Sequence, residues 1–433
     1  MDPIVVGIIG IIVMLALLVL GVPIAFCMAV VGIFGTAIVA GVSQTLSQIV
    51  LITWDKGTDF IIVCIPLFIF MGQLTSSTGI AADLYEFLQR WLGRLPGGLA
   101  IASVGACGAF GAVTGSSVAC VATMGSIVYP QMKKYNYDVG LSTGCLAASG
   151  TLGILIPPSL AFAFYGILTD TSIAALFIAG IIPGIVTMVM FAGIILTQCL
   201  MNPKLGPIGP KYTWTEKLVS LKGIVPVAII FLLVIGTLYG GLCTPTEASG
   251  IGATGVVLVS LFMKKLTFKN FRKALWDTGV TTAFIFAIII GGYLIARFLV
   301  VTNISNLILD YVNTLSLGKY TFILFLVVLY TVLGCILDVF GMTILTLPFV
   351  FPVVIALGID PIWFGVFIVI MTEVALITPP VGVNVFVMRS IATDVPMGRI
   401  FKGIMPFLLG EFAVIALLVV FPAMATWLPK MMN

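Results

Sequence analysis

The sequence predicts an all-α protein that crosses a membrane many times. Of its 433 residues, 61% are hydrophobic and only 8% are charged, and the mean hydropathy is +1.26. Soluble domains carry about 25% charged residues, so this chain lacks the charge needed to cover a water-facing surface of its size. Apolar runs of about 18 residues or more, each long enough to cross a bilayer, recur along the whole chain.

Twelve apolar stretches divide the chain, and ten of them are expected to cross the membrane once. The stretches are 4–20, 22–42, 58–78, 98–133, 139–168, 172–200, 223–240, 245–263, 279–300, 320–357, 361–392 and 403–428. Because 98–133 and 320–357 are too long for one crossing and have a polar kink in the middle, we interpret them as re-entrant helical hairpins. Paired prolines interrupt 139–168 and 361–392, which are therefore expected to be broken helices.

The basic residues favour one orientation of these segments. If the N-terminus is outside the cytoplasm, sixteen of the 20 Lys and Arg residues fall on the cytoplasmic side, as the positive-inside rule requires. They are Arg90, Arg94, Lys133, Lys134, Lys204, Lys211, Lys217, Lys222, Lys264, Lys265, Lys269, Arg272, Lys273, Arg389, Arg399 and Lys402, which leaves Lys56, Arg297, Lys319 and Lys430 outside. We therefore expect both termini to lie outside the cytoplasm.

The second half of the chain repeats the first at an offset of 222 residues. The coincident positions are Pro23 with Pro245, Pro130 with Pro352, Asp138 with Asp360, Pro157 with Pro379 and Pro158 with Pro380. Four proline matches exceed what 22 prolines in 433 residues give by chance. The halves, about 1–210 and 220–433, have five crossings each, so the second is expected to be inverted. Inverted repeats are typical of secondary transporters, although channels can also contain them.

Absent residue types exclude several kinds of chemistry. The chain has no histidine, which excludes Ser-His-Asp triads, His-ligated zinc or haem and imidazole proton relays. It also lacks a phosphate-binding Gly-x-x-x-x-Gly-Lys-Ser/Thr loop. We expect no enzyme activity, because the hydroxyls of Ser116 and Ser117 have no partner base in an apolar segment. No organic cofactor and no nucleic-acid partner are expected.

Small polar residues gather at equivalent places in the two halves. They lie at the hairpin tips 111–118 and 337–343 and at the breaks 149–159 and 372–384. Prolines and glycines there interrupt the helices and free backbone carbonyls, which a small hard cation can satisfy. These carbonyls and the hydroxyls of Ser116, Ser117, Thr343 and Thr378 could form a sodium shell. The N-termini of the half-helices would attract an anion.

Three charged residues lie in or near these segments. Asp338, aligned with Ser116, could balance a cation or contact a substrate, since charges inside a membrane are costly and usually functional. Glu373, aligned with Thr151, could bind sodium, carry a proton, or be a neutral buried acid. Arg389 could contact an anionic substrate or simply anchor the cytoplasmic end of its helix.

Two further segments, 80–94 and 302–314, are moderately amphipathic and precede the hairpins. They suit interfacial arm helices, although an ordinary loop helix is the alternative.

The motifs together resemble one family. They are Gly21-Val22-Pro23-Ile24-Ala25-Phe26, Gly115-Ser116-Ser117, Ile156-Pro157-Pro158-Ser159, Thr244-Pro245-Thr246-Glu247-Ala248 and Ile377-Thr378-Pro379-Pro380-Val381-Gly382-Val383-Asn384. This combination and its spacing resemble the large membrane subunit of tripartite ATP-independent periplasmic (TRAP) transporters. The resemblance covers essentially the whole chain.

The resemblance implies sodium-coupled import of an organic acid, such as a C4-dicarboxylate or a sialic acid, in a bacterial inner membrane. It implies two partners, a small four-helix membrane subunit and a periplasmic substrate-binding protein. It also implies an elevator mechanism, in which a transport domain at 98–168 and 320–392 slides against a scaffold made of the other crossings and the arms.

Carried onto this chain, the resemblance implies two sodium sites and a substrate site. One sodium set is Gly115, Ser116, Ser117, Gly150, Thr151 and Gly153, and the other is Asp338, Gly341, Thr343, Thr372, Glu373 and Thr378. The substrate candidates are Ser116, Ser117, Ser159, Asp338, Asn384 and Arg389. The alternatives are a proton-coupled anion carrier that uses Glu373 or Asp338, and an anion channel.

Overall fold

The computed structural model describes residues 2–304, 306–307, 318–335 and 337–431, and every regular element within them is a helix. The first half contains α1 (Pro3–Val19), α2 (Ile24–Ala40), α3 (Val42–Thr58), α4 (Cys64–Ser77), α5 (Ile80–Leu92), α6 (Gly98–Thr114), α7 (Ser117–Lys134), α8 (Val139–Ser149), α9 (Leu152–Leu155), α10 (Leu160–Thr169) and α11 (Ile173–Met201). The second half contains α12 (Trp214–Ser220), α13 (Val225–Phe231), α14 (Thr237–Tyr239), α15 (Pro245–Phe262), α16 (Phe268–Val301), α18 (Lys319–Gly334), α19 (Val339–Ala356), α20 (Pro361–Ile377), α21 (Val383–Ile391), α22 (Met397–Val420) and α23 (Ala423–Lys430).

The helices are long and apolar enough for a membrane protein. Six of them could cross a bilayer, or eight spans if each of two bent helix pairs counts as one, among the residues that the structure describes. Five shorter apolar helices accompany them, namely α1, α2, α6, α18 and α20. The predicted all-α polytopic class is confirmed.

Several predicted boundaries were wrong. The stretch 403–428 is not one helix, because α22 ends at Val420 and α23 begins after Pro422. The stretch 279–300 is only the second part of the 34-residue helix α16. Residues 42–58, which lie mostly outside the predicted stretches, form α3. Of the two predicted arms, 80–94 is helix α5, whereas most of 302–314 lies outside the described residues.

Helix bounds in the two halves correspond at the offset found in the sequence. Adding 222 to the bounds of α7, Ser117–Lys134, gives 339–356, which are the bounds of α19. Adding 222 to the span of α8 and α9, 139–155, gives 361–377, which are the bounds of α20.

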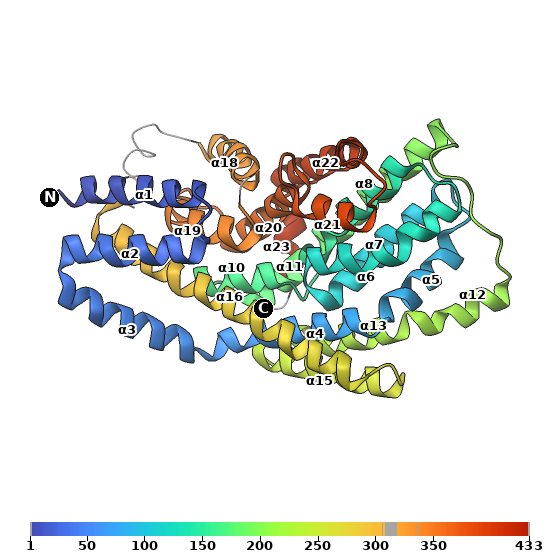
Figure 1. The fold of residues 1–433 in the computed structure, drawn as a ribbon, viewed down its shortest axis with the longest axis horizontal. Helices are drawn as coiled ribbons and strands as arrows, with labels where there is room; N and C mark the ends of the chain where they lie inside the picture. Colours follow the sequence, from blue (N-terminus) through green and yellow to red (C-terminus); the bar gives the residue numbers. More distant parts are fainter. Residues whose placement is uncertain (1, 305, 308–317, 336, 432–433) are drawn as a thin grey trace.

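Contacts between helices come in exchanged pairs. Helix α2 packs along α16, and the equivalent pair is α15 with α4; α8 packs along α22, and the equivalent pair is α20 with α11. Such an exchange is what an approximate two-fold relation produces. In Figure 1, α2, α3, α4 and α16 run along one side of the molecule, and the hairpins and broken helices lie together beside them.

Small residues allow the two halves to approach closely where α8 meets α22. A Cβ atom on Gly144 would overlap the backbone of Gly403, and one on Gly403 would overlap the backbone of Gly140. Glycines at this spacing are typical of tight helix contacts in membranes, where van der Waals packing replaces the hydrophobic effect. The halves therefore meet backbone to backbone, and a side chain at these positions would force them apart.

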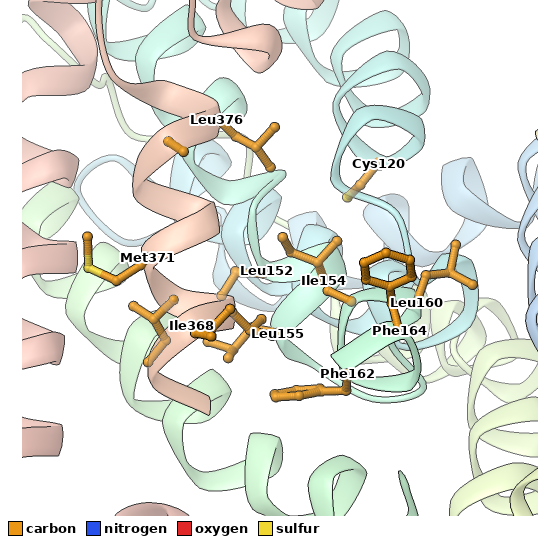
Figure 2. Packing of buried hydrophobic residues seen from close by; sticks show 14 of the residues in the cluster. Cys120, Leu152, Ile154, Leu155, Leu160, Phe162, Phe164, Ile368, Met371 and Leu376 are labelled. Atoms are coloured by element: carbon orange, nitrogen blue, oxygen red, sulfur yellow. The ribbon is translucent and has the colours of Figure 1, made fainter. Parts of the chain in front are cut away.

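Apolar side chains fill the space beside the first break. Leu155 of α9 lies next to Ile368 of α20, with Leu152 on the same side of that helix, and all three are buried (Figure 2). The one-turn helix α9 is therefore held in place by the equivalent helix of the other half. This packing fixes the positions of the polar residues that flank it.

Candidate substrate and ion site

The first hairpin turns at Gly115 and Ser116. Gly115 has φ +60°, a conformation that favours glycine, and it ends α6. The Ser116 hydroxyl caps α7 by accepting from the Ala119 N–H at 3.4 Å. This cap places the start of α7, and its partly positive end, at the tip of the hairpin.

The first break is a non-helical stretch between α8 and α10 with one helical turn, α9, inside it. Its peptide bond between Pro157 and Pro158 is cis. The Ser159 hydroxyl donates to the Ile154 carbonyl and accepts from the Phe162 N–H at 3.3 Å. Ser159 therefore links the two sides of the break and caps α10, and its hydroxyl already forms two hydrogen bonds within its own segment.

The tip and the break of the first half lie against each other. A Cβ atom on Gly115 would stand 3.0 Å from the Pro158 carbonyl oxygen, and one on Gly153 would stand 2.9 Å from the Ser116 carbonyl oxygen. Such contacts leave no room for larger side chains. The structure thus brings together Gly115, Ser116 and Gly153 of the first predicted sodium set.

The second half repeats this arrangement with different side chains. Asp338 caps α19 by accepting from the Gly341 N–H at 3.2 Å. The Cys335 thiol, just before the tip, donates to the Pro379 carbonyl at 3.1 Å, which joins this hairpin to the second break. The bond between Pro379 and Pro380 is also cis. The second tip therefore also lies against the paired prolines of its own half.

The predicted threonines of the second set use their hydroxyl protons inside their own helices. Thr343 donates to Val339 at 2.7 Å, Thr372 to Val369 at 2.7 Å and Thr378 to Val374 at 2.6 Å. A hydroxyl that donates its proton still offers lone pairs to a cation. No hydrogen bond joins these threonines to Asp338 within the part of the chain that the structure describes.

Asn384 connects the two halves at the first tip. Its side-chain N–H₂ donates to the Ser117 hydroxyl at 2.7 Å and to the Ala147 carbonyl at 3.1 Å, and the side chain is fully buried. Its amide oxygen has no hydrogen-bond partner among the described residues. Two predicted substrate residues, Ser117 and Asn384, are thus in direct contact, although they are 267 positions apart.

Arg389 lies at the other end of α21 from Asn384. Its guanidinium donates to the carbonyls of Ala392 at 3.1 Å and Thr393 at 2.5 Å, which follow the helix. Cationic side chains stabilise helix C-termini in this way. The structure therefore gives Arg389 a capping contact and does not bring it to the hairpin tips.

A buried acid that the sequence reasoning missed lies next to the first break. Glu411, on α22, accepts from the Thr151 hydroxyl at 3.3 Å through one carboxyl oxygen, and its other oxygen has no partner among the described residues. Glu373 is also fully buried, and neither of its oxygens has a partner there. The sequence could have identified Glu411, because it is an acidic residue inside an apolar run, and such residues are usually functional.

A small cavity of about 160 Å³ lies between α10, α16 and α19, away from the predicted residues. Thr169, Tyr293 and Pro348 are among its lining residues. The Tyr293 hydroxyl donates to the Ile167 carbonyl at 3.1 Å, which joins α16 to the first broken helix.

Two ion pairs join the halves where the predicted cytoplasmic segments meet. Lys133 contacts Asp394 at 2.7 Å, and Arg399 contacts Asp138 at 3.0 Å. The hydrogen bond from Lys133 lowers the pKa of the Asp394 carboxyl, and Asp394 in turn raises the pKa of Lys133. These exposed pairs position the loop after α7 against the loop after α21.

Comparisons with known proteins agree with this architecture. Residues 11–424 match the model of the "Tripartite ATP-independent periplasmic transporter, DctM component" family. The chain is 32% identical to the C4-dicarboxylate TRAP transporter large permease protein DctM of Pseudomonas aeruginosa, over 87% of this chain and 88% of that protein. It is 29% identical to the sialic acid TRAP transporter large permease protein SiaM of Vibrio cholerae, over 86% and 87% of the two chains.

A solved structure supports the fold. The YdaH transporter of Alcanivorax borkumensis superposes with a TM-score of 0.59 at 14% identity and covers 89% of each chain. The family match over nearly the whole chain also agrees with the absence of enzyme motifs. The chain therefore belongs to the DctM component family of tripartite ATP-independent periplasmic transporters, and is a membrane transport protein and not an enzyme.

Proposed function

We propose that this chain imports an organic acid by coupling its movement to sodium ions. The substrate class is a carboxylate such as a C4-dicarboxylate or a sialic acid, the compounds named for two of its relatives. The protein would lie in the inner membrane of a bacterium with both termini in the periplasm, which is the orientation that its Lys and Arg residues favour.

The observation that carries this proposal is the contact of each hairpin tip with a break. Gly115 lies against Pro158 in the first half, and Cys335 bonds to Pro379 in the second. Where an interrupted helix meets a hairpin tip, backbone carbonyl and hydroxyl oxygens are exposed, and these can bind sodium. Helix N-termini are exposed at the same place, and these can bind a carboxylate. The two predicted sodium sets remain our candidates for the ion sites, and Ser117 with Asn384 for the substrate.

We further propose that the hairpins and broken helices move as one body. The bond from Asn384 to Ser117 and the packing of α8 on α22 support a single body made from both halves. Because α11 and α22 pack on the broken helices, this body would extend beyond the predicted ranges 98–168 and 320–392 to include them. The scaffold would then contain α1–α4 and α13–α16.

The proposed complex has two further proteins. A small four-helix membrane subunit would pack beside the scaffold, and a periplasmic binding protein would deliver the carboxylate. Co-purification of the three proteins tests this part of the proposal. A second test is transport by the large subunit alone, which should import no substrate.

Uptake by the reconstituted complex tests sodium coupling. Each net positive charge carried inward gains about 2.3 kcal/mol per 100 mV, so two sodium ions with one monocarboxylate would be driven inward by a negative interior. Uptake should stop when potassium replaces sodium, and uptake of a monocarboxylate such as a sialic acid should rise with an inside-negative potential. Full-rate uptake in potassium alone would contradict the proposal.

A proton-coupled carrier that uses Glu373 or Asp338 is the second candidate, because Glu373 is fully buried and forms no ion pair within the described residues. Under that mechanism Glu373→Gln should abolish uptake, and an inward proton gradient should drive it without sodium. Under sodium coupling, sodium-driven uptake should at least partly survive this substitution.

A further inference from the structure

Several buried oxygen atoms beside the first break have no hydrogen-bond partner among the described residues. They include the second carboxyl oxygen of Glu411, the amide oxygen of Asn384 and the Ser149 hydroxyl, all without a hydrogen-bond partner among the described residues. Asn384 and Thr151 are fixed beside them by bonds to the Ala147 and Ala148 carbonyls at 3.1 Å and 2.7 Å. Unsatisfied buried polar atoms are rare in native proteins, and each of these requires a further partner such as an ion or an ordered water.

Two buried carboxyl groups belong to this region. Glu373 and Glu411 are both 0% exposed; they lie on α20 and α22, which pack against each other, and α20 also packs on α9 of the first break. Neither forms an ion pair within the described residues. The nearest basic residue before Glu411 on α22 is Lys402, nine positions and about 13 Å along the helix axis. An uncompensated buried carboxylate is strongly disfavoured, so each of these two groups must either keep its proton or be neutralised by a cation.

The direction of α8 adds to this requirement. Helix α8 runs from Val139 to Ser149, so its C-terminus, which carries a partial negative charge, ends beside Thr151. Its final carbonyls, the Thr151 hydroxyl oxygen and the two carboxyl groups are all oxygen donors to a hard cation. The Thr151 hydroxyl proton can point to only one of its two acceptors, Ala148 or Glu411, at a time.

From this geometry we infer that Glu411 is a sodium-binding residue, and that it and Glu373 neutralise a cation held between α22, α20 and the first break. The inference rests on the proposed sodium coupling and adds to it a residue outside both predicted sodium sets. Glu411 would act as a charge partner close to Thr151, with Glu373 as the second carboxylate. The site combines residues from both halves of the chain.

Sodium binding to the purified full chain tests the inference without measuring transport. We would measure ²²Na⁺ binding and the sodium-dependent rise in melting temperature in detergent, with choline as the replacement cation. Glu411→Gln keeps the size of the side chain and can still accept from Thr151, so it removes chiefly the charge. We expect it to weaken sodium binding about ten- to a hundredfold and to reduce the sodium-dependent thermal shift.

Glu247→Gln is the matched control. Glu247 also accepts from a threonine hydroxyl, that of Thr244 at 2.9 Å, but it lies exposed at the start of α15. Its substitution should leave sodium binding unchanged. Thr151→Val is the second test variant, should Glu411→Gln fail to fold, and it should also weaken sodium binding because it removes an oxygen from the same place.

The outcomes separate this inference from the proposed function. If the unmodified protein binds no sodium, the proposed coupling fails, and the inference with it. If it binds sodium and Glu411→Gln binds it with unchanged affinity and stoichiometry, the inference alone is overturned, whatever the effect of Thr151→Val. Uptake of protons by Glu411 with no change in sodium binding on its substitution would equally overturn it. Weaker binding in these variants, with unchanged binding in Glu247→Gln, supports it.

Discussion

Replacement of Asn384 by alanine should loosen the contact between the two halves. The substitution removes two buried hydrogen bonds, to Ser117 at 2.7 Å and to Ala147 at 3.1 Å. Single side-chain bonds in membrane proteins contribute about 0.6 kcal/mol on average and up to about 1.7. We therefore expect a loss of about 1–3 kcal/mol in the free energy of unfolding, measured in mixed micelles, and a loss of sodium-dependent uptake in proteoliposomes.

Asn270→Ala provides the comparison. Asn270 donates one hydrogen bond, to the Ser77 carbonyl at 3.0 Å, and joins α16 to α4 in the proposed scaffold. Its replacement should cost about 1 kcal/mol and leave the sodium dependence of uptake unchanged. A double-mutant cycle of Asn384→Ala with Ser117→Ala should give a coupling energy of about 0.6–1.7 kcal/mol. Additive effects, or equal losses of uptake in the two asparagine variants, would refute the reasoning.

Three further predictions concern single positions. Gly115→Ala should destabilise the first hairpin by about 1–2 kcal/mol, seen as faster protease cleavage at the tip, because its φ of +60° disfavours a side chain; unchanged cleavage would contradict this. Glu373→Gln should reduce sodium-driven uptake without abolishing it, because Glu411 still supplies a carboxylate to the inferred cation site. Complete loss of uptake in this variant, together with proton-driven uptake in the unmodified protein, would favour the proton mechanism. The contact of Lys133 with Asp394 should stabilise the protein at pH values above the usual aspartate pKa of about 3.9, and this stabilisation should be lost as the pH falls through the lowered pKa of Asp394. Asp394→Asn should therefore make the melting temperature depend less on pH in the acid range.

The helical class could be predicted from composition because apolar runs in lipid have few structural solutions. The hairpins and breaks were predictable for a local reason, since glycines and paired prolines act on their own segment. Gly115 with a positive φ and Pro157-Pro158 between α9 and α10 are examples. The boundaries that were wrong depend on less local causes. Helix α16 extends to Phe268 through a segment with four charges, which hydropathy alone excludes from a crossing.

Contacts between distant residues could not be predicted in the same way. The bond between Asn384 and Ser117 depends on how α21 lies against α7, and no spacing in the sequence encodes that contact. Arg389 is a different case, because the sequence left open a substrate contact and a helix-end anchor, and in the structure its guanidinium donates to carbonyls at the end of its own helix. For a charged side chain near a helix end, capping satisfies the backbone at once and competes with any role farther away.

The two breaks differ in sequence, and packing gives the first of them a carboxyl group that its own half lacks. Thr151 and Glu373 occupy equivalent positions at the offset of 222, so the repeat alone places an acid only in the second half. In the structure Glu411 reaches Thr151 from α22, whereas the position 222 residues before it, in α11, is Val189. Helix α20 of the second half thus contains an acidic residue in its own sequence. The equivalent segment of the first half, α8 with α9, receives one from α22 of the other half. A comparison of aligned positions therefore misses the carboxyl group that packing between the halves supplies to the first broken helix, which is why Glu411 could not be found from the repeat.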